Sequence, residues 1–154
     1  MNEQLRRAEL TPKLVDSLYT EAMVLADEAR SYFDIGDDPE RIGLDPLTRV
    51  GFACESLKVT TRLMHVIAWL LTQRAVRAGE LTPAQANTPD RRLGDAPQSD
   101  HLLARKFPDA ARLLIRQSEE LFDRVRRLDT VTSEPAEHDG SPARSLMSRL
   151  ERSI

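Results

Sequence analysis

The side chains that most often bind metals or catalyse reactions are few and widely separated in this sequence. Its three histidines, His65, His101 and His138, lie in different segments. None belongs to an HExxH motif, and none has a cysteine pair or a carboxylate at the spacing of metal ligands. No glycine-rich loop is present that could cradle a phosphate. We therefore expect no catalytic residue, no metal and no cofactor, and a protein that is not an enzyme.

The single cysteine also argues against chemistry. Cys54 lies between Val50 and Leu57 at helical spacing, so we expect a small buried side chain and not a reactive thiolate. His65 and Trp69 are one helical turn apart, a pair that could line a pocket but is more typical of partial burial. One cysteine excludes an internal disulfide and is typical of a reducing cytoplasm, where we expect the protein to reside.

Length, charge and hydropathy narrow the class of protein. A chain of 154 residues with 40% apolar side chains is enough for one domain. A formal net charge of -3 does not favour a protein whose main task is to neutralise phosphates. The longest unbroken apolar run, Val66 to Leu71, is far shorter than the roughly 20 residues of a membrane span. We expect a soluble protein without a membrane anchor.

Helical spacing dominates the chain and predicts an all-α fold. Capped starts and apolar steps of three and four residues predict helices over Pro12 to Asp34, from Pro46 to just before Gly79, and over Pro108 to Leu128. The stretch between the last two is turn-rich and expected to be irregular. We predict a three-helix bundle over residues 11–129, a flexible N-terminus at 1–10 and a disordered tail at 130–154.

The second helix is the longest and carries two apolar rows. It would be about 50 Å long, against about 30 to 35 Å for the other two. One row has the spacing of a helix seam and comprises Leu47, Val50, Cys54, Leu57, Thr61, Met64, Ala68, Leu71 and Ala75. A second row lies beside it, so this over-long helix should be covered on two sides. Either the chain after Gly79 folds back over it, or a second copy of the protein packs against it.

Of these two interpretations we favour the homodimer. Its predicted interface comprises Leu63, Val66, Ile67, Trp69 and Leu70.

Two further sets of residues are candidates for partner binding. The first comprises Lys58, Thr60 and Arg62, polar side chains that a bundle does not need. The second lies in the tail and comprises Leu146, Met147, Leu150 and Ile154. Their three- and four-residue steps predict an amphipathic helix that forms when a groove is offered.

The third helix suggests a different function. Its arginines, Arg112, Arg116, Arg124, Arg126 and Arg127, could contact DNA phosphates. Glu119, Glu120 and Asp123 interrupt this row, however, and ion pairing in solvent explains the pattern as well. A DNA-binding or transcription-regulating helical dimer therefore remains the alternative.

Three segments of the chain resemble a known family in order and spacing. They are "YTEAMVLADEARSYFD", "ACESLKVTTRLMHVIAWLLTQRAVRAGELTPAQA" and "FPDAARLLIRQSEELFDRVRRLD". They are similar to the proteins called regulator of CtrA degradation, the RcdA family, over about residues 17–129. The resemblance is most specific between Glu55 and Val76.

The resemblance implies a three-helix, dimeric adaptor of the ClpXP protease without enzymatic activity. Such adaptors bind ClpX together with CpdR and deliver cargo such as cell-cycle transcription regulators, and their tail takes part in these contacts. The stretch after Ala86 and the tail depart from the family pattern, so the resemblance does not identify the cargo.

Overall fold

Three long helices form the body of the protein in the computed structural model, which describes residues 12–34, 43–133 and 149–150. They are α2 (Pro12–Phe33), α4 (Pro46–Arg77) and α7 (Asp109–Ser133), and two short helices, α5 (Pro83–Ala86) and α6 (His101–Ala104), lie between α4 and α7. The described residues contain no strand, which confirms the all-α prediction. The predicted flexible N-terminus and most of the predicted tail lie outside the described residues.

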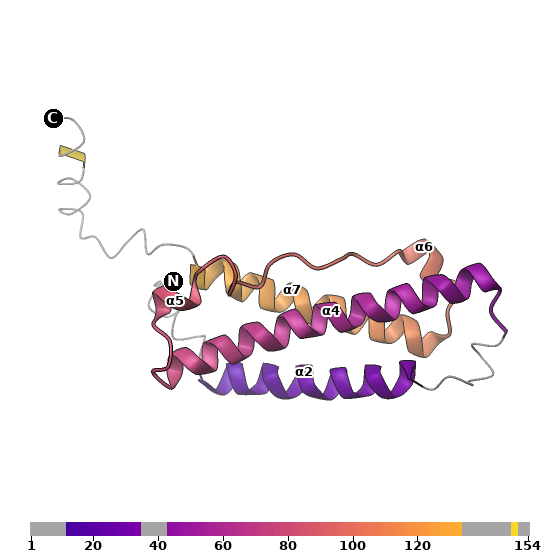
Figure 1. The fold of residues 1–154 in the computed structure, drawn as a ribbon, viewed down its shortest axis with the longest axis horizontal. Coiled ribbons are helices and arrows are strands. Elements are labelled where there is room, and N and C mark those ends of the chain that lie inside the picture. Colours follow the sequence, from indigo (N-terminus) through magenta and orange to yellow (C-terminus); the bar gives the residue numbers. More distant parts are fainter. Residues whose placement is uncertain (1–11, 35–42, 134–148, 151–154) are drawn as a thin grey trace.

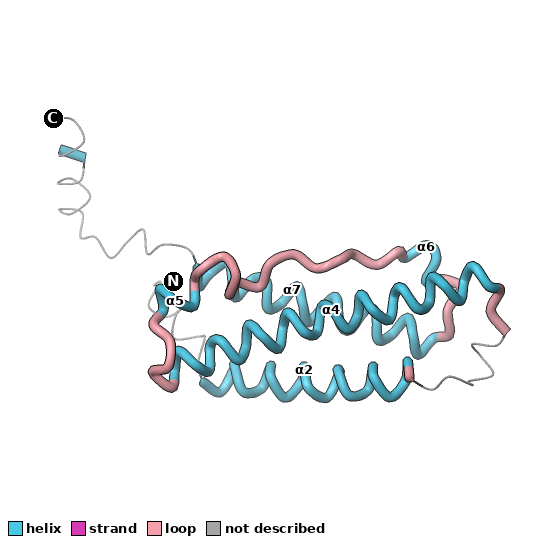
Figure 2. The backbone as a smooth tube through the Cα atoms, viewed as in Figure 1, coloured by secondary structure: helices cyan, strands magenta, loops and turns pink. Residues whose placement is uncertain are grey.

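The direction of the helices depends on the connection between α4 and α7. Figure 1 shows α2 antiparallel to α4, whereas α7 runs in the same direction as α4. This is possible because residues 87–100, which we call the strap, return along the bundle without regular structure (Figure 2). The chain after Gly79 thus folds back over α4, which is the interpretation that we did not favour from the sequence.

Local signals explain where α4 begins and ends. The Asp45 side chain caps the helix by accepting a hydrogen bond from the Thr48 amide at 2.9 Å, and Pro46 occupies the first turn. Gly79 follows the helix with a φ of 78°, a conformation that other residues rarely adopt. The sequence placed both boundaries correctly to within two residues.

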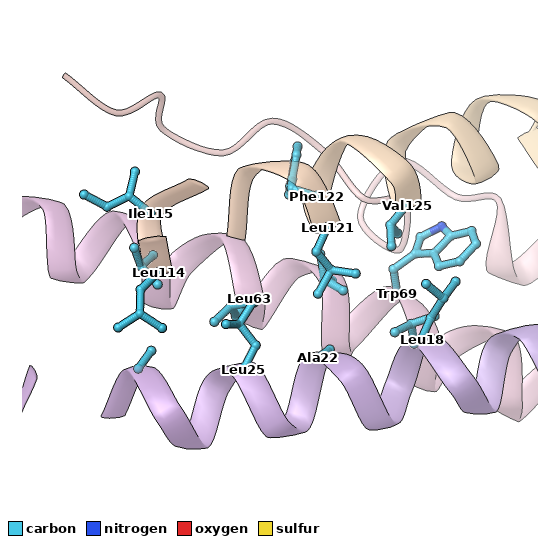
Figure 3. Packing of buried hydrophobic residues seen from close by; sticks show 14 of the residues in the cluster. Leu18, Ala22, Leu25, Leu63, Trp69, Leu114, Ile115, Leu121, Phe122 and Val125 are labelled. Carbon is cyan, nitrogen blue, oxygen red and sulfur yellow. The ribbon is translucent and has the colours of Figure 1, made fainter. Parts of the chain in front are cut away.

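The core lies where α2, α4 and α7 meet. Leu18 and Leu25 of α2, Leu63 and Trp69 of α4, and Val125 of α7 are all buried in it (Figure 3). The indole Nε1 of Trp69 donates a hydrogen bond to Asp129 at 2.8 Å, and Asp129 is itself buried. Since this contact gives the last part of α7 a buried partner, α7 continues to Ser133, beyond the predicted end at Leu128.

Two polar side chains of α4 bind the strap, one at its C-terminal end and one near its middle. Glu55, only 1% exposed, accepts hydrogen bonds from the Asp100 amide and from Lys58, each at 2.9 Å. Further along α4, His65 Nδ1 lies 2.9 Å from the carbonyl oxygen of Leu93, so this ring nitrogen donates to the strap. His65 is therefore partly buried in a structural contact, as the sequence indicated.

Arg62 binds the strap between these two points, from inside the protein. Its guanidinium donates to the Pro97 carbonyl at 3.3 Å, to the Ser118 hydroxyl of α7 at 3.0 Å, and to the Ser99 hydroxyl. Burial lowers the pKa of Arg62 from its ordinary value, although nearby carboxylates act in the opposite direction. One side chain thus joins α4, the strap and α7.

Gly51 allows α6 to approach α4 closely. A Cβ atom at this position would lie 2.2 Å from Cδ2 of Leu103, so the leucine would have to move. In an otherwise open helical site, alanine is more favourable than glycine by about 0.5 to 1 kcal/mol. The two residues should therefore be energetically coupled.

We expect Gly51→Ala to lower the free energy of unfolding in the native background, because the new methyl group overlaps Leu103. In the Leu103→Ala background, where there is room, the same substitution should raise the free energy of unfolding by about 0.5 to 1 kcal/mol. Urea denaturation of the four proteins of this double-mutant cycle measures the coupling. Equal effects of Gly51→Ala in both backgrounds would contradict the close approach of α6.

A second prediction concerns the Glu55 carboxylate. Burial alone would raise the pKa of Glu55, but hydrogen bonds from the Asp100 amide, Ser99 and Lys58 outweigh burial and hold it below the ordinary value. The stabilisation is therefore fully present above the unfolded pKa, about 4.3, and is lost as the pH falls through the lower folded pKa. We expect Glu55→Gln to reduce the free energy of unfolding by about 1 to 3 kcal/mol at pH 7.

This difference should shrink as the pH is lowered below about 4, because the native carboxyl group then takes up its proton. Urea denaturation between pH 3 and pH 7 measures it, with Glu28→Gln on the exposed face of α2 as the matched control. A difference that stays constant over this range would show that the charge of Glu55 does not stabilise the strap.

Candidate interaction surface

One apolar face of α4 is exposed over most of the helix, with only Thr61 and Ala75 partly buried. We call it the α4 stripe, and it comprises Leu47, Val50, Cys54, Leu57, Thr61, Met64, Ala68, Leu71 and Ala75. Leu47, Leu57 and Met64 are 81%, 67% and 63% exposed, and Val50 and Leu71 are also exposed. The sequence predicted this row to be a covered seam, but within one chain it is not covered, because α2, α7 and the strap occupy the other sides of α4. Cys54 is likewise exposed and not buried as expected.

The stripe carries no charge over most of its length. Between Val50 and Leu71, every exposed residue of α4 is uncharged: Val50, Ala53, Cys54, Leu57, Thr60, Met64, Ala68 and Leu71. The charged side chains of this stretch are used elsewhere, since Glu55 and Arg62 are buried and Lys58 pairs with Glu55. A solvated helix face usually carries charged residues, so this composition indicates a surface that contacts another protein.

The residues predicted to form a dimer interface lie mainly inside the single chain. Leu63, Val66, Trp69 and Leu70 are at most 2% exposed, and Ile67 is partly buried against the same core. They pack among the helices and under the strap, so four of the five have no accessible surface for a second copy. The two-sided apolar character of α4 is thus explained within one chain.

The predicted partner-binding residues have separate environments. Arg62 is 3% exposed and holds the strap, so it is not a surface group. Lys58 is partly exposed and ion-paired, whereas Thr60 is exposed with its hydroxyl donating to the Ser56 carbonyl at 3.0 Å. In the tail, Leu150 is exposed, while Leu146, Met147 and Ile154 lie outside the described residues.

The arginines of α7 are largely engaged with carboxylates. Arg112 pairs with Asp109, Arg126 pairs with Asp123, and Arg124 pairs with Glu21 of α2. These pairs are on the surface, as expected for solvated ion pairing. No observation on α7 favours contact with nucleic acid.

A polar hollow of about 310 Å³ lies between the strap and α7. Its lining includes Arg62 and Arg126 but also Asp95, Glu119 and Asp123, so the two signs of charge are mixed. Within residues 12–34, 43–133 and 149–150, no group of three or more His, Cys, Asp or Glu side chains could hold a metal ion. No helix in that part of the chain is long and apolar enough to cross a membrane.

The signal that identifies the α4 stripe was present in the sequence. Both rows of α4 are apolar, but only the side of the helix with Leu63 and Val66 also carries polar groups that bind an extended segment. These groups are Glu55, Arg62 and His65. Buried polar residues need partners, so this mixed row was the one that the returning chain had to cover. The uncharged row was the one left exposed.

Comparison with known proteins agrees with this architecture. A family model described as "Protein of unknown function (DUF1465)" matches residues 6–154. Among solved structures, RcdA from Caulobacter crescentus CB15 is similar with 33% sequence identity and a TM-score of 0.64. The similarity covers 80% of this chain and 93% of that one. None of the curated proteins gives a significant match.

A match over nearly the whole sequence, together with the shared fold and one-third identity to RcdA, confirms the resemblance found in the sequence. The chain belongs to the RcdA-like family, DUF1465.

Proposed function

We propose that this protein is a non-enzymatic adaptor that helps to deliver cell-cycle regulators to the ClpXP protease. In this proposal it acts in the cytoplasm as a homodimer, without a cofactor, and binds ClpX together with CpdR. The observation that carries the proposal is the 33% identity to RcdA over 80% of the chain. The activity itself is the one that the family resemblance implies.

The surface of the molecule suits such a role. An adaptor works through contacts with other proteins, and a long uncharged helix face is typical of a surface that becomes covered. The side chains that could take part in chemistry have structural roles instead. His65 and Arg62 bind the strap, and Glu55 binds its C-terminal end. Thr60 is exposed beside the stripe, and Lys58 is partly exposed there although it pairs with Glu55.

The tail supplies a second proposed contact. Leu146, Met147, Leu150 and Ile154 would share one side of a helix of about a dozen residues, a length that is marginal in water. Such a segment gains its helical structure from the groove that receives it. We propose that it binds one of the partners and contributes little to the bundle.

The adaptor proposal predicts that binding of ClpX depends on CpdR. With the purified protein immobilised, we expect ClpX to be retained when CpdR is present and to be washed away when it is absent. Beads that carry CpdR without the adaptor provide the control. Absence of ClpX from the retained fraction in both conditions would contradict the proposal, and so would equal retention in both.

The tail proposal predicts that deletion of residues 134–154 weakens one partner contact but leaves thermal unfolding of the bundle unchanged within a few degrees. Leu150→Asp should reproduce most of the loss, because it places a charge on the apolar side. Ser148→Asp adds the same charge on the polar side and is the matched control. Equal cargo delivery by all four proteins, measured near the binding midpoint, would argue against a role for the tail.

A further inference from the structure

The α4 stripe has the repeat of a two-stranded coiled coil. Its nine residues follow alternating steps of three and four from Leu47 to Ala75, which is a heptad pattern with two positions per repeat. The corresponding face of a coiled coil is covered by a second helix of similar length. In the single chain seven of these nine residues are exposed, and Thr61 and Ala75 are partly buried.

The length of the stripe selects the partner. From Leu47 to Ala75 it extends over about 42 Å at 1.5 Å per residue. The apolar segment of the tail, residues 143–154, would cover only about 18 Å as a helix. A second α4 has the same length and the same repeat, so a second copy of this chain fits the whole stripe.

The sizes of the side chains select the orientation. The two positions of the repeat differ in side-chain size. One is occupied mostly by small side chains: Cys54, Thr61, Ala68 and Ala75. The other is occupied by larger side chains: Val50, Leu57, Met64 and Leu71. A parallel pair in register would place each residue against its own copy. Layers with two large side chains would then be overpacked, and layers with two small side chains would leave cavities. An antiparallel pair can place the large row of one helix against the small row of the other, which keeps the packing even.

One antiparallel register pairs large with small throughout. In it Leu57 faces the partner's Ala68, Thr61 faces the partner's Met64, and Cys54 faces the partner's Leu71. Val50 then faces the partner's Ala75. Leu47 also belongs to the row of small side chains but is itself large, and it faces the partner's Ala78. The two-fold axis crosses the stripe between Thr61 and Met64.

We infer that two copies of this protein pair through the α4 stripe, antiparallel and in this register. The inference rests on the homodimer of the proposed function and assigns its surface and its geometry. It replaces the interface predicted from the sequence, because Leu63, Val66, Trp69 and Leu70 are covered within one chain.

Disulfide cross-linking tests the register, with the native Cys54 as the probe. The full-length protein with Leu71→Cys should form a covalent dimer on mild oxidation, because Cys54 and the partner's position 71 face each other within the reach of a disulfide. The unchanged protein should not, since the two copies of Cys54 would be about 25 Å apart along the helices. Leu71→Cys combined with Cys54→Ser is the matched control and should not cross-link either.

The outcomes separate this inference from the proposal on which it rests. Cross-linking of the unchanged protein through Cys54 would indicate a parallel pair and overturn the orientation. A dimer by light scattering without any cross-link would place the interface elsewhere and overturn the inference, leaving the homodimer itself intact. A monomer by light scattering for the unchanged protein would contradict both. A monomer whose Cys54 becomes reactive only after deletion of residues 134–154 would assign the stripe to the tail.

A charge in the stripe provides a second test that needs no cysteine. Leu57→Asp should raise the dimer dissociation constant by at least about 30-fold, the effect of a central interface residue. Because Leu57 is 67% exposed, the single chain should still fold. Leu102→Asp on α6 changes a residue that is 73% exposed outside the stripe and should leave the dissociation constant unchanged. Equal effects of the two substitutions would contradict the assignment.

Discussion

The attachment of the strap to α4 determines which surfaces of this protein are covered. Arg62 is its centre: a buried guanidinium that donates to the strap at Pro97 and Ser99 and to α7 at Ser118. A buried charged group must be fully hydrogen-bonded, because removing it from water is costly. The strap provides two of those acceptors, and its return along the bundle also allows α7 to run in the same direction as α4. The placement of α7 and the covering of one apolar row of α4 follow from this arrangement.

The other consequence is the surface that remains open. With α2, α7 and the strap around it, α4 has three covered sides and one exposed side, and the exposed side has no charged residue between Val50 and Leu71. Natural monomers seldom expose a long apolar row of this kind. In an RcdA-like protein, a helix face that serves self-association would leave the strap side, the α7 surface and the tail free for other partners.

Much of the fold was predictable because its signals are local. Asp45 with Pro46 and Gly79 mark the ends of α4, and helical spacing gives the three long helices. The end of α7 was placed too early, since its last turn depends on the long-range contact between Trp69 and Asp129. The roles of the two α4 rows were also exchanged: the row predicted to form the dimer interface lies in the core, and the predicted seam is exposed. This too depends on a long-range contact, the one between α4 and the strap. Periodicity alone shows only that both rows are apolar, whereas the polar residues Glu55, Arg62 and His65 of one row mark the side to which the strap binds.

The central claim, that the α4 stripe is exposed in one chain and covered by a second copy, can be measured through the native thiol of Cys54. Its rate of alkylation should be recorded over a range of protein concentrations, together with the molar mass from light scattering. The account predicts a rate typical of an exposed thiol in dilute protein, which falls as the molar mass rises to that of a dimer. A dimer whose Cys54 reacts as fast as it does in the dilute monomer would contradict the claim.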